Sequence, residues 1–127
     1  MDYSKLSDFE INKRVSICIH PDIKNWNCYD VSGRACFVIN EGTPKRVQYG
    51  FSFTSDPADA WPIITANKIS IYAMSDADKR GGWGAEAFHP NDAYSFNDNP
   101  LRAAMIVFLM MQELANVPAT STGSDLR

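Results

Sequence analysis

The stretch Val47-Gln-Tyr-Gly-Phe-Ser-Phe53 alternates large apolar side chains with polar or small ones. Because successive side chains of a β-strand point to opposite faces of a sheet, this period of two predicts a half-buried strand. Upstream, the apolar run 36–39 predicts a second strand, and segment 41–44 has the residues of a hairpin loop between them. A weaker strand is expected at 28–31, before Ser32-Gly33.

Both ends of the chain predict helices. Ser7 and Glu10 have the spacing of a capping box, so a helix is expected over 8–18. Asn99-Pro100 places a capping residue before a proline, which is typical of a helix start. The helix that follows is apolar on nearly all sides over 101–111, which predicts that it is covered on most sides.

The middle of the chain begins with another helix start, Asp56-Pro57. Pro62 leaves two alternatives, a short turn followed by a new start near this proline, or one kinked helix to about residue 67. Beyond it we expect a strand at 69–75, a polar loop at 76–82, a returning strand at 83–89 and a loop at 90–98.

Together these elements predict a single α+β domain over 1–117. In it, an antiparallel sheet of four or five strands packs against the N-terminal and C-terminal helices, with 56–67 as a connection on the surface. Residues 118–127 are small and polar, so we expect a disordered tail. Exposed sheet edges favour a homodimer or larger oligomer.

Composition excludes several classes of partner. The chain has 127 residues, of which 45% are hydrophobic, and this is enough to build a core. Its first residues lack the basic start and apolar stretch of a secretory signal, and its longest apolar run, 103–111, is about half of what crossing a bilayer requires. The formal charge of −3 provides no overall positive field, so nucleic acid is disfavoured unless Lys13-Arg14, Lys45-Arg46 and Lys79-Arg80 converge.

The sequence also argues against a metal site and against catalysis. Cys18, Cys28 and Cys36 are odd in number, which excludes a closed disulfide framework and favours a reducing compartment. Their spacing matches no zinc pattern, and His20 and His89 stand alone before prolines. We therefore expect no metal, no cofactor and no catalytic residue.

Three blocks of sequence carry a family resemblance: 1–13, Asp56 to Ile64 with 67–71, and 99–113. They resemble the NinX family of lambdoid phages and enterobacterial prophages. The resemblance implies a protein of the bacterial cytoplasm, encoded in a phage accessory region whose neighbours often act in recombination, late regulation or resistance to host defence. It implies no activity, because the family has none assigned.

Two tryptophans lie beside charged residues. Asp59 is close to Trp61, and Lys79-Arg80 is close to Trp83. An aromatic face with a nearby cation could hold a nucleobase and its phosphate. Core packing is the favoured interpretation for Trp61, and Trp83 is open between core packing and a binding role.

Arg102 stands in the first turn of the C-terminal helix, where the positive end of the helix dipole disfavours a cation. Its guanidinium and the free N–H groups behind Asn99 would suit an anion, and the alternative is a salt bridge to Asp98 or another carboxylate. The pairs Asp76 and Asp78, or Asp56 and Asp59, are better interpreted as turn and cap residues than as acid–base pairs. The candidate ligand-binding residues are Trp83, Arg80, Arg102, Trp61, Asp59 and Asn99.

The leading functional hypothesis is a non-enzymatic phage accessory protein that blocks a host defence by binding and sequestering a small nucleotide signal. A first alternative is a protein-binding inhibitor or regulator of a host or phage enzyme. A second is an accessory protein of DNA recombination or replication, which the acidic balance disfavours. An enzyme is the last choice.

Overall fold

The computed structural model describes residues 1–89 and 91–115, which form an α+β fold with three α-helices and two three-stranded antiparallel sheets. The expected helix end at Val117-Pro118 and the expected tail lie outside these residues. In chain order the elements are a 3₁₀ turn (Tyr3–Lys5), α1 (Asp8–Ile19), a second 3₁₀ turn (Pro21–Ile23), β1 (Asn27–Val31), β2 (Arg34–Ile39), β3 (Val47–Phe51), α2 (Pro57–Ala66), β4 (Ser70–Ala73), β5 (Trp83–Ala87), β6 (Ala93–Asn97) and α3 (Pro100–Ala115).

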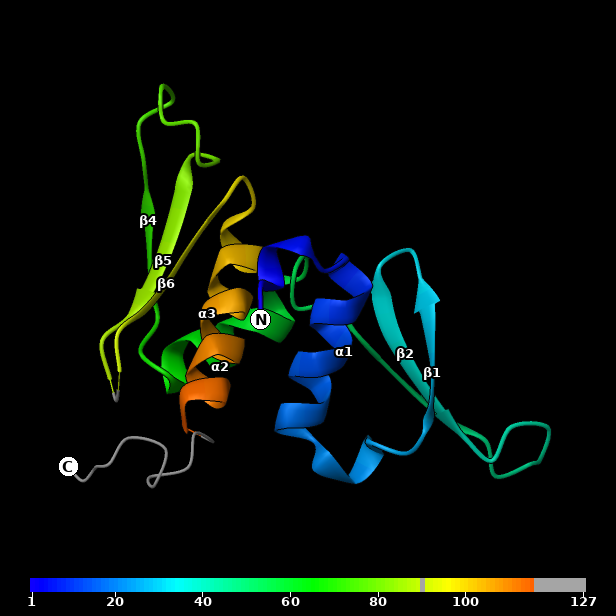
Figure 1. The fold of residues 1–127 in the computed structure, drawn as a ribbon. Helices are drawn as coiled ribbons and strands as arrows, with labels where there is room; N and C mark the ends of the chain where they lie inside the picture. Colours follow the sequence, from blue (N-terminus) through cyan, green and yellow to red (C-terminus); the bar gives the residue numbers. More distant parts are fainter. Residues whose placement is uncertain (90, 116–127) are drawn as a thin grey trace.

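The strands form two separate sheets, and the prediction of one sheet of four or five strands is wrong. Sheet A has the order β1-β2-β3, and sheet B has the order β4-β5-β6. Figure 1 shows α1 and α3 side by side between the two sheets. Helix α1 packs on β2, and α3 packs on β5 and β6. Because α2 carries the chain from β3 to β4, and each sheet buries its inner face against its own helix, the edges of the two sheets do not pair.

The start of α1 is confirmed as a capping box. The Glu10 backbone N–H donates to Ser7 Oγ at 3.1 Å, and the Ser7 N–H donates to Glu10 Oε1 at 3.2 Å. The helix runs one residue beyond the expected end, to Ile19, and Pro21 then opens the second 3₁₀ turn. Local spacing was enough to predict this element because both capping contacts join residues three apart.

Helix α2 is a single helix that contains Pro62, so the second of the two alternatives holds. Asp56 caps it by accepting from the Ala58 N–H at 2.9 Å. The helix buries Ile63 and Ile64 in the core, which corrects the prediction of a mere surface connection. The burial of this face compensates for the backbone hydrogen bond that a proline inside a helix removes.

Strand β6 lies where a loop was predicted. Ala93–Asn97 pairs antiparallel with β5, so that Ala93 faces Ala87 and Asn97 faces Trp83. The flanking residues Asn91-Asp92 and Asp98-Asn99 are typical of turns, and for this reason the short strand between them was predicted to be part of a loop. Pairing with β5 fixes the conformation and register of this segment.

The hydrophobic core has two parts that meet at one residue. The larger part joins α3, α2, α1 and sheet B, and α3 buries nearly its whole circumference there, as predicted. The smaller part lies between α1 and sheet A around the fully buried Phe37. Phe51 of β3 packs against both parts. No helix among the described residues is long and apolar enough to cross a membrane.

A buried polar bridge also joins the two halves. Asn12 of α1 is fully buried, and its Nδ2 donates to the Gly33 carbonyl at 2.9 Å and to Thr54 Oγ1 at 3.2 Å. Its Oδ1 accepts from the Thr54 N–H at 3.1 Å, and the Thr54 carbonyl accepts from Asn99 Nδ2 at 2.7 Å. The chain of contacts connects α1, the β3–α2 connection and the start of α3.

Candidate functional site

The face of sheet B that points away from α3 is aromatic. The strand register places Tyr72 of β4, Gly84 of β5 and Phe96 of β6 in one row across the sheet. Alternate residues of a strand share a face, so Tyr94 lies on the same side as Phe96, and their ring centroids are 5.7 Å apart. The opposite side carries Ala85, which is fully buried. We call Tyr72, Gly84, Tyr94 and Phe96 the aromatic face.

Gly84 is the floor of the aromatic face. A Cβ atom at this position would lie 2.4 Å from the ring of Tyr72, closer than two such carbon atoms can approach. The ring of Tyr72 therefore crosses β5 only because residue 84 is glycine. Tyr72 is 36% exposed and Tyr94 is 53% exposed, so their rings are accessible to a ligand.

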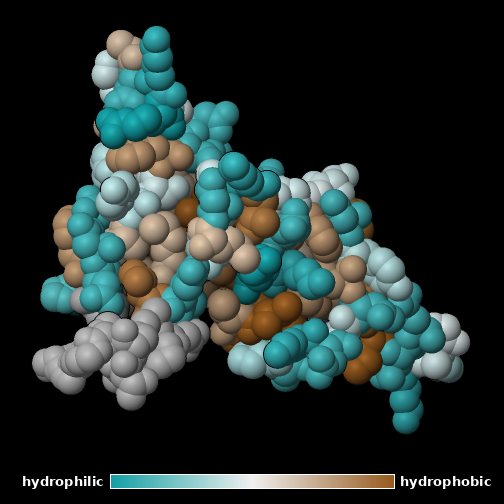
Figure 2. Space-filling model, in the orientation of Figure 1, coloured by the Kyte–Doolittle hydropathy of each residue, from teal (hydrophilic) through white to brown (hydrophobic). Residues whose placement is uncertain are grey.

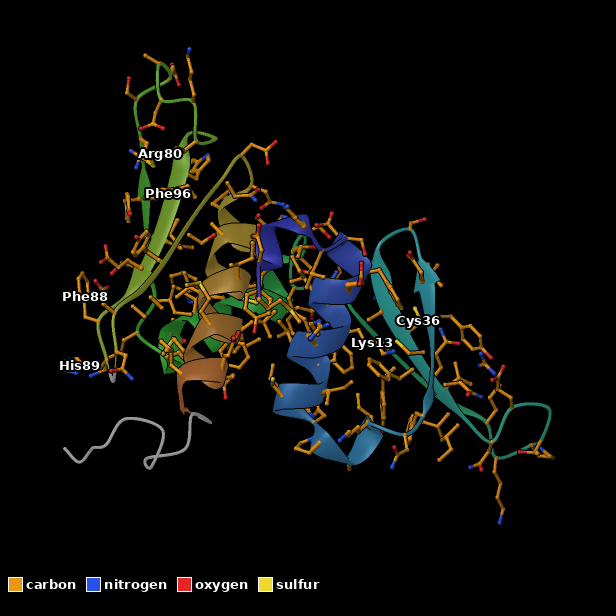
Figure 3. The ribbon with its side chains drawn as sticks, viewed as in Figure 1. Lys13, Cys36, Arg80, Phe88, His89 and Phe96 are labelled. Atoms are coloured by element: carbon orange, nitrogen blue, oxygen red, sulfur yellow. The ribbon has the colours of Figure 1, made fainter. Side chains whose placement is uncertain are left out.

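Arg80 covers one end of the aromatic face (Figure 3). Its guanidinium carbon lies 4.2 Å from the centroid of the Phe96 ring, which is a cation–π contact. Asp78 holds the guanidinium in place, because Arg80 Nε and Nη2 donate to its two carboxylate oxygens at 3.0 and 2.7 Å. These hydrogen bonds from Arg80 lower the pKa of Asp78 to about 2. The guanidinium is thus oriented before any ligand arrives.

The other end of the aromatic face is acidic. Glu86 pairs with Tyr94 in the register and lies on the same side of the sheet. A hydrogen bond with Asp92, in the β5–β6 turn, raises the pKa of Glu86, since two neighbouring carboxylates ionise less readily than one. The face therefore offers a guanidinium at one end, hydrogen-bond acceptors at the other, and aromatic rings between them.

Trp83 lies on the inner side of sheet B, although sequence proximity suggested that it would pair with Arg80. By strand alternation it shares a side with Ala85, whereas Arg80 lies over Phe96 on the aromatic face. Trp83 is 37% exposed at the start of β5. The structure replaces the expected contact between Arg80 and a tryptophan with a contact between Arg80 and a phenylalanine.

Trp61 is 60% exposed on α2, so the prediction that it packs in the core is wrong. The helix buries Ala60, Ile63 and Ile64, and these residues leave Trp61 on the solvent side. Asp59 is nearby in sequence, and its Oδ2 accepts from the Ser52 backbone N–H at 3.0 Å. The carboxylate of Asp59 therefore ties α2 to the end of sheet A.

Asn99 caps α3. Its Oδ1 accepts from the backbone N–H groups of Leu101 and Arg102 at 2.9 and 3.2 Å, while its Nδ2 donates to the Thr54 carbonyl. Both the oxygen and the nitrogen of the Asn99 side-chain amide thus have hydrogen-bond partners within the protein.

Arg102 makes the salt bridge that was the alternative to an anion site, with Asp8 in place of Asp98. Its Nη1 donates to Asp8 Oδ1 at 2.7 Å, and its Nη2 donates to the carbonyls of Leu6 and Ser4 at 2.6 and 3.2 Å. The Arg102 side chain is only 13% exposed. It anchors the N-terminal segment to α3.

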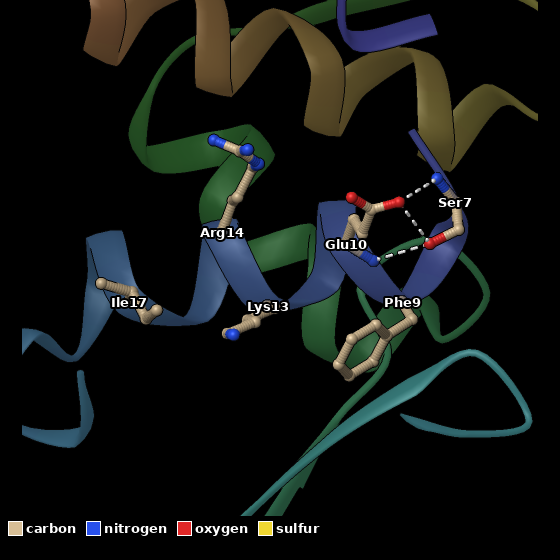
Figure 4. Close-up of a pocket in the computed structure, with 6 residues that line it drawn as sticks. All are labelled: Ser7, Phe9, Glu10, Lys13, Arg14 and Ile17. Atoms are coloured by element: carbon tan, nitrogen blue, oxygen red, sulfur yellow. Dashed lines mark hydrogen bonds between the residues drawn. The ribbon is translucent and has the colours of Figure 1, made fainter. Parts of the chain in front are cut away.

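A separate hollow of about 580 Å³ runs along α1 (Figure 4). Two of its lining residues form the capping box, and two are cations. Figure 2 shows hydrophobic surface over the lower half of α1, whereas the tip of the β4–β5 loop is hydrophilic. The lining residues of the hollow are Ser7, Phe9, Glu10, Lys13, Arg14 and Ile17.

The three basic pairs lie on three separate elements. Lys13-Arg14 is on α1, Lys45-Arg46 is in the β2–β3 loop, and Lys79-Arg80 is in the β4–β5 loop. Figure 1 shows these two loops at opposite ends of the molecule. The pairs therefore do not form the common basic surface that the DNA-binding hypothesis required. Within residues 1–89 and 91–115, no three His, Cys, Asp or Glu side chains gather as a metal site would require.

Sequence reasoning missed the aromatic face because it missed β6. Tyr94 and Phe96 alternate with Ala93, Ser95 and Asn97, which is a strand pattern of period two. Recognising it would have placed two aromatic rings on one side of a strand next to β5. The contact between Arg80 and Phe96 would still require the pairing register.

Comparison with known proteins supports a phage origin. Residues 2–112 match the family model described as Bacteriophage P22, NinX. A crystal structure of a phage protein from Bacillus cereus ATCC 14579 has a similar fold, with a TM-score of 0.55 and 15% identity over 85% of this chain and 89% of that chain. No curated protein sequence matches the chain significantly.

Proposed function

The chain belongs to the NinX family of phage proteins, and we propose that it is a non-enzymatic accessory protein that binds a small nucleotide on the aromatic face of sheet B. The observation that carries the proposal is the guanidinium of Arg80, held 4.2 Å from the Phe96 ring beside the accessible rings of Tyr72 and Tyr94. Aromatic rings and an oriented guanidinium are the groups that bind a base and a phosphate.

The two ends of the aromatic face suggest a direction for the ligand. Arg80 keeps unused N–H groups that can donate to a phosphate, although Asp78 neutralises part of its charge. Glu86 and Asp92 at the other end can accept hydrogen bonds from the N–H groups of a base. Stacking on the rings between them is worth about 1–3 kcal/mol per base.

A single nucleotide fits this surface better than a nucleic-acid strand. The acidic pair Glu86 and Asp92 would repel the next phosphate along a strand, and the chain as a whole has a formal charge of −3. Binding without chemistry would make the protein a sequestering agent, which lowers the free concentration of its ligand. In an infected cell, such an agent would suit a phage that must silence a nucleotide signal of host defence.

The test is native mass spectrometry of the purified protein with linear, cyclic and ADP-ribose-type nucleotides, followed by calorimetry on any ligand found. We expect one nucleotide class to bind with a Kd of about 1 μM or lower. Failure of the whole panel would remove the proposal. The same spectra report whether the protein is the homo-oligomer that its open sheet edges favour.

Two glycines provide a matched pair of variants. Gly84→Ala should weaken nucleotide binding about tenfold or more, because the added Cβ displaces the ring of Tyr72 from the aromatic face. Gly50→Ala on sheet A is the control, since the closest atom to its Cβ would be at the flexible end of the Arg34 side chain, at 2.9 Å, and Cys36 Sγ would lie at an ordinary contact distance of 3.5 Å. Phe96→Ala is a second variant in case Gly84→Ala folds poorly. Unchanged affinity in both sheet B variants would refute the site.

A protein-binding role is the second candidate, and the outer face of sheet A favours it. Tyr29 and Val31 of edge strand β1 are 46% and 49% exposed beside the buried Cys36 and Val38. The exposed apolar surface of this face is therefore the pair Tyr29 and Val31, at the edge of the sheet. A partner retained by the wild type and lost by Val31→Asp would support this role, while equal retention by the two proteins would argue against it.

A further inference from the structure

We propose that a second site, at the end of α1 and far along the chain from the aromatic face, binds a guanidinium group. The site is a hollow of about 360 Å³ between the α1–β1 connection and β3. This volume lies in the range of small-ligand sites and is far larger than a bare metal ion needs. We call it the aromatic hollow, and its lining residues are His20, Asp22, Ile23, Tyr49 and Phe51.

The walls of the aromatic hollow are stacked rings. The His20 ring stacks on Phe51 with centroids 5.4 Å apart and 26° between planes. The Trp26 ring, from the residue before β1, stacks on Tyr49 of β3, with ring centroids 5.6 Å apart and 16° between the planes. Ile23 is 2% exposed and closes the floor. These contacts hold flat aromatic surfaces in place before a ligand enters, which lowers the entropy cost of binding.

Three electrostatic features of the aromatic hollow favour a cation. Asp22 contributes a carboxylate to the lining, and the half-exposed Tyr49 contributes an aromatic ring, whose faces carry partial negative charge. His20 follows the last residue of α1, so the negative end of the helix dipole also lies here. Among the described residues, neither the Asp22 carboxylate nor the Tyr49 hydroxyl has a hydrogen-bond or ion-pair partner.

A guanidinium matches the aromatic hollow better than other cations. It is planar, so it can stack on the exposed ring of Tyr49, and its fork of N–H donors can bind both oxygens of Asp22. A lysine-type ammonium could use the carboxylate but would lose the flat stacking contact. An anion would be repelled by Asp22 and by the end of α1.

Binding is tested by NMR titration of the full chain with three acetylated amino-acid amides: arginine, lysine and citrulline. Citrulline has almost the shape of arginine but no charge. We expect arginine amide to shift the signals of residues around His20 and Tyr49, lysine amide to bind more weakly, and citrulline amide to leave them unchanged. Agmatine, a free guanidinium compound, is titrated in parallel. Tighter binding of agmatine than of arginine amide would indicate a free guanidinium compound as the ligand, and the reverse order would indicate an arginine side chain. Equal shifts with citrulline amide would overturn the proposal.

Asp22→Asn is the decisive variant, because it keeps the shape of the side chain and removes its charge. We expect it to weaken binding of arginine amide about tenfold or more. Asp76→Asn, in the β4–β5 loop, makes the same change in net charge away from the hollow and should bind as the wild type. Both residues are exposed, so neither change should disturb folding. If Asp22→Asn binds arginine amide as tightly as the wild type does, the site is refuted. Gly84→Ala tests whether this site is independent of the proposed nucleotide site, because this variant should bind arginine amide as the wild type does.

Discussion

Sheet A and sheet B each bury one face against a helix. In sheet A the bulky buried side chains come from the strands, whereas in sheet B they come from the helix. Sheet A supplies the bulk itself through Phe37, which is fully buried, and through Phe51. Sheet B presents alanines at Ala85, Ala87 and Ala93, and the bulk comes from α3. Small residues on a sheet let a helix approach closely, whereas large residues on a sheet set its distance. The two halves should therefore respond in opposite ways to changes of side-chain size.

The largest effect is expected from removing bulk on sheet A. Phe37→Ala leaves a cavity under α1 and should lower the free energy of unfolding by about 3–5 kcal/mol. Urea unfolding followed by circular dichroism measures the change. Val47→Ala is the control, because Val47 lies on the same side of the sheet but is 39% exposed, and it should cost under about 1 kcal/mol. Similar losses in both variants would show that sheet A does not depend on its buried ring.

The next effect concerns the polar bridge between the halves. Asn12→Ala removes three hydrogen bonds and leaves the Gly33 carbonyl and the Thr54 N–H without their partner, so it should cost about 2–4 kcal/mol. Asn27→Ala is the control. The Asn27 side chain is exposed and donates a hydrogen bond to Glu41, so its removal should change the free energy of unfolding by less than about 0.5 kcal/mol.

The polar bridge also bears on whether the halves unfold together. We expect the wild type to unfold in one transition, with a reduced slope or a second transition only in Asn12→Ala. Two transitions in the wild type would show that the sheets are independent units despite the shared contacts at Thr54 and Phe51.

Sheet B should be sensitive to added bulk. Ala85→Val inserts two methyl groups where β5 meets α3, and overpacking of this kind typically costs about 1–3 kcal/mol. Ala73→Val is matched to it, because Ala73 is an exposed strand residue of the same sheet, where a β-branched side chain is tolerated. A stabilised Ala85→Val protein would mean that α3 does not lie close to the sheet floor.

The elements that the sequence predicted correctly depend on short-range contacts. Ser7 with Glu10, Asp56 with Ala58, and Asn99 with Leu101 are caps whose partners lie two or three residues away. Such pairs can be recognised in a linear sequence because the helix geometry is fixed.

The parts that could not be predicted depend on contacts between distant residues. Arg102 and Asp8 are 94 positions apart, and Asn12 and Thr54 are 42 apart. The division of six strands into two sheets likewise follows from which helix covers which face. The contact between Arg80 and Phe96 could not be predicted for this reason, since the two residues meet only through the pairing of β5 with β6.

The smallest effect is a pH dependence at the N-terminal segment that covers α3. Tyr3 is buried and its hydroxyl donates to Glu113, and burial, with this hydrogen bond, raises the pKa of Tyr3 from 10.0 to about 12. The folded protein therefore favours the protonated phenol, so the contribution to stability is complete below pH 10 and declines as the pH rises from about 10 to 12. The difference in unfolding free energy between wild type and Tyr3→Phe should shrink over this interval. A constant difference over this interval would place the Tyr3 hydroxyl outside the packed contact with α3.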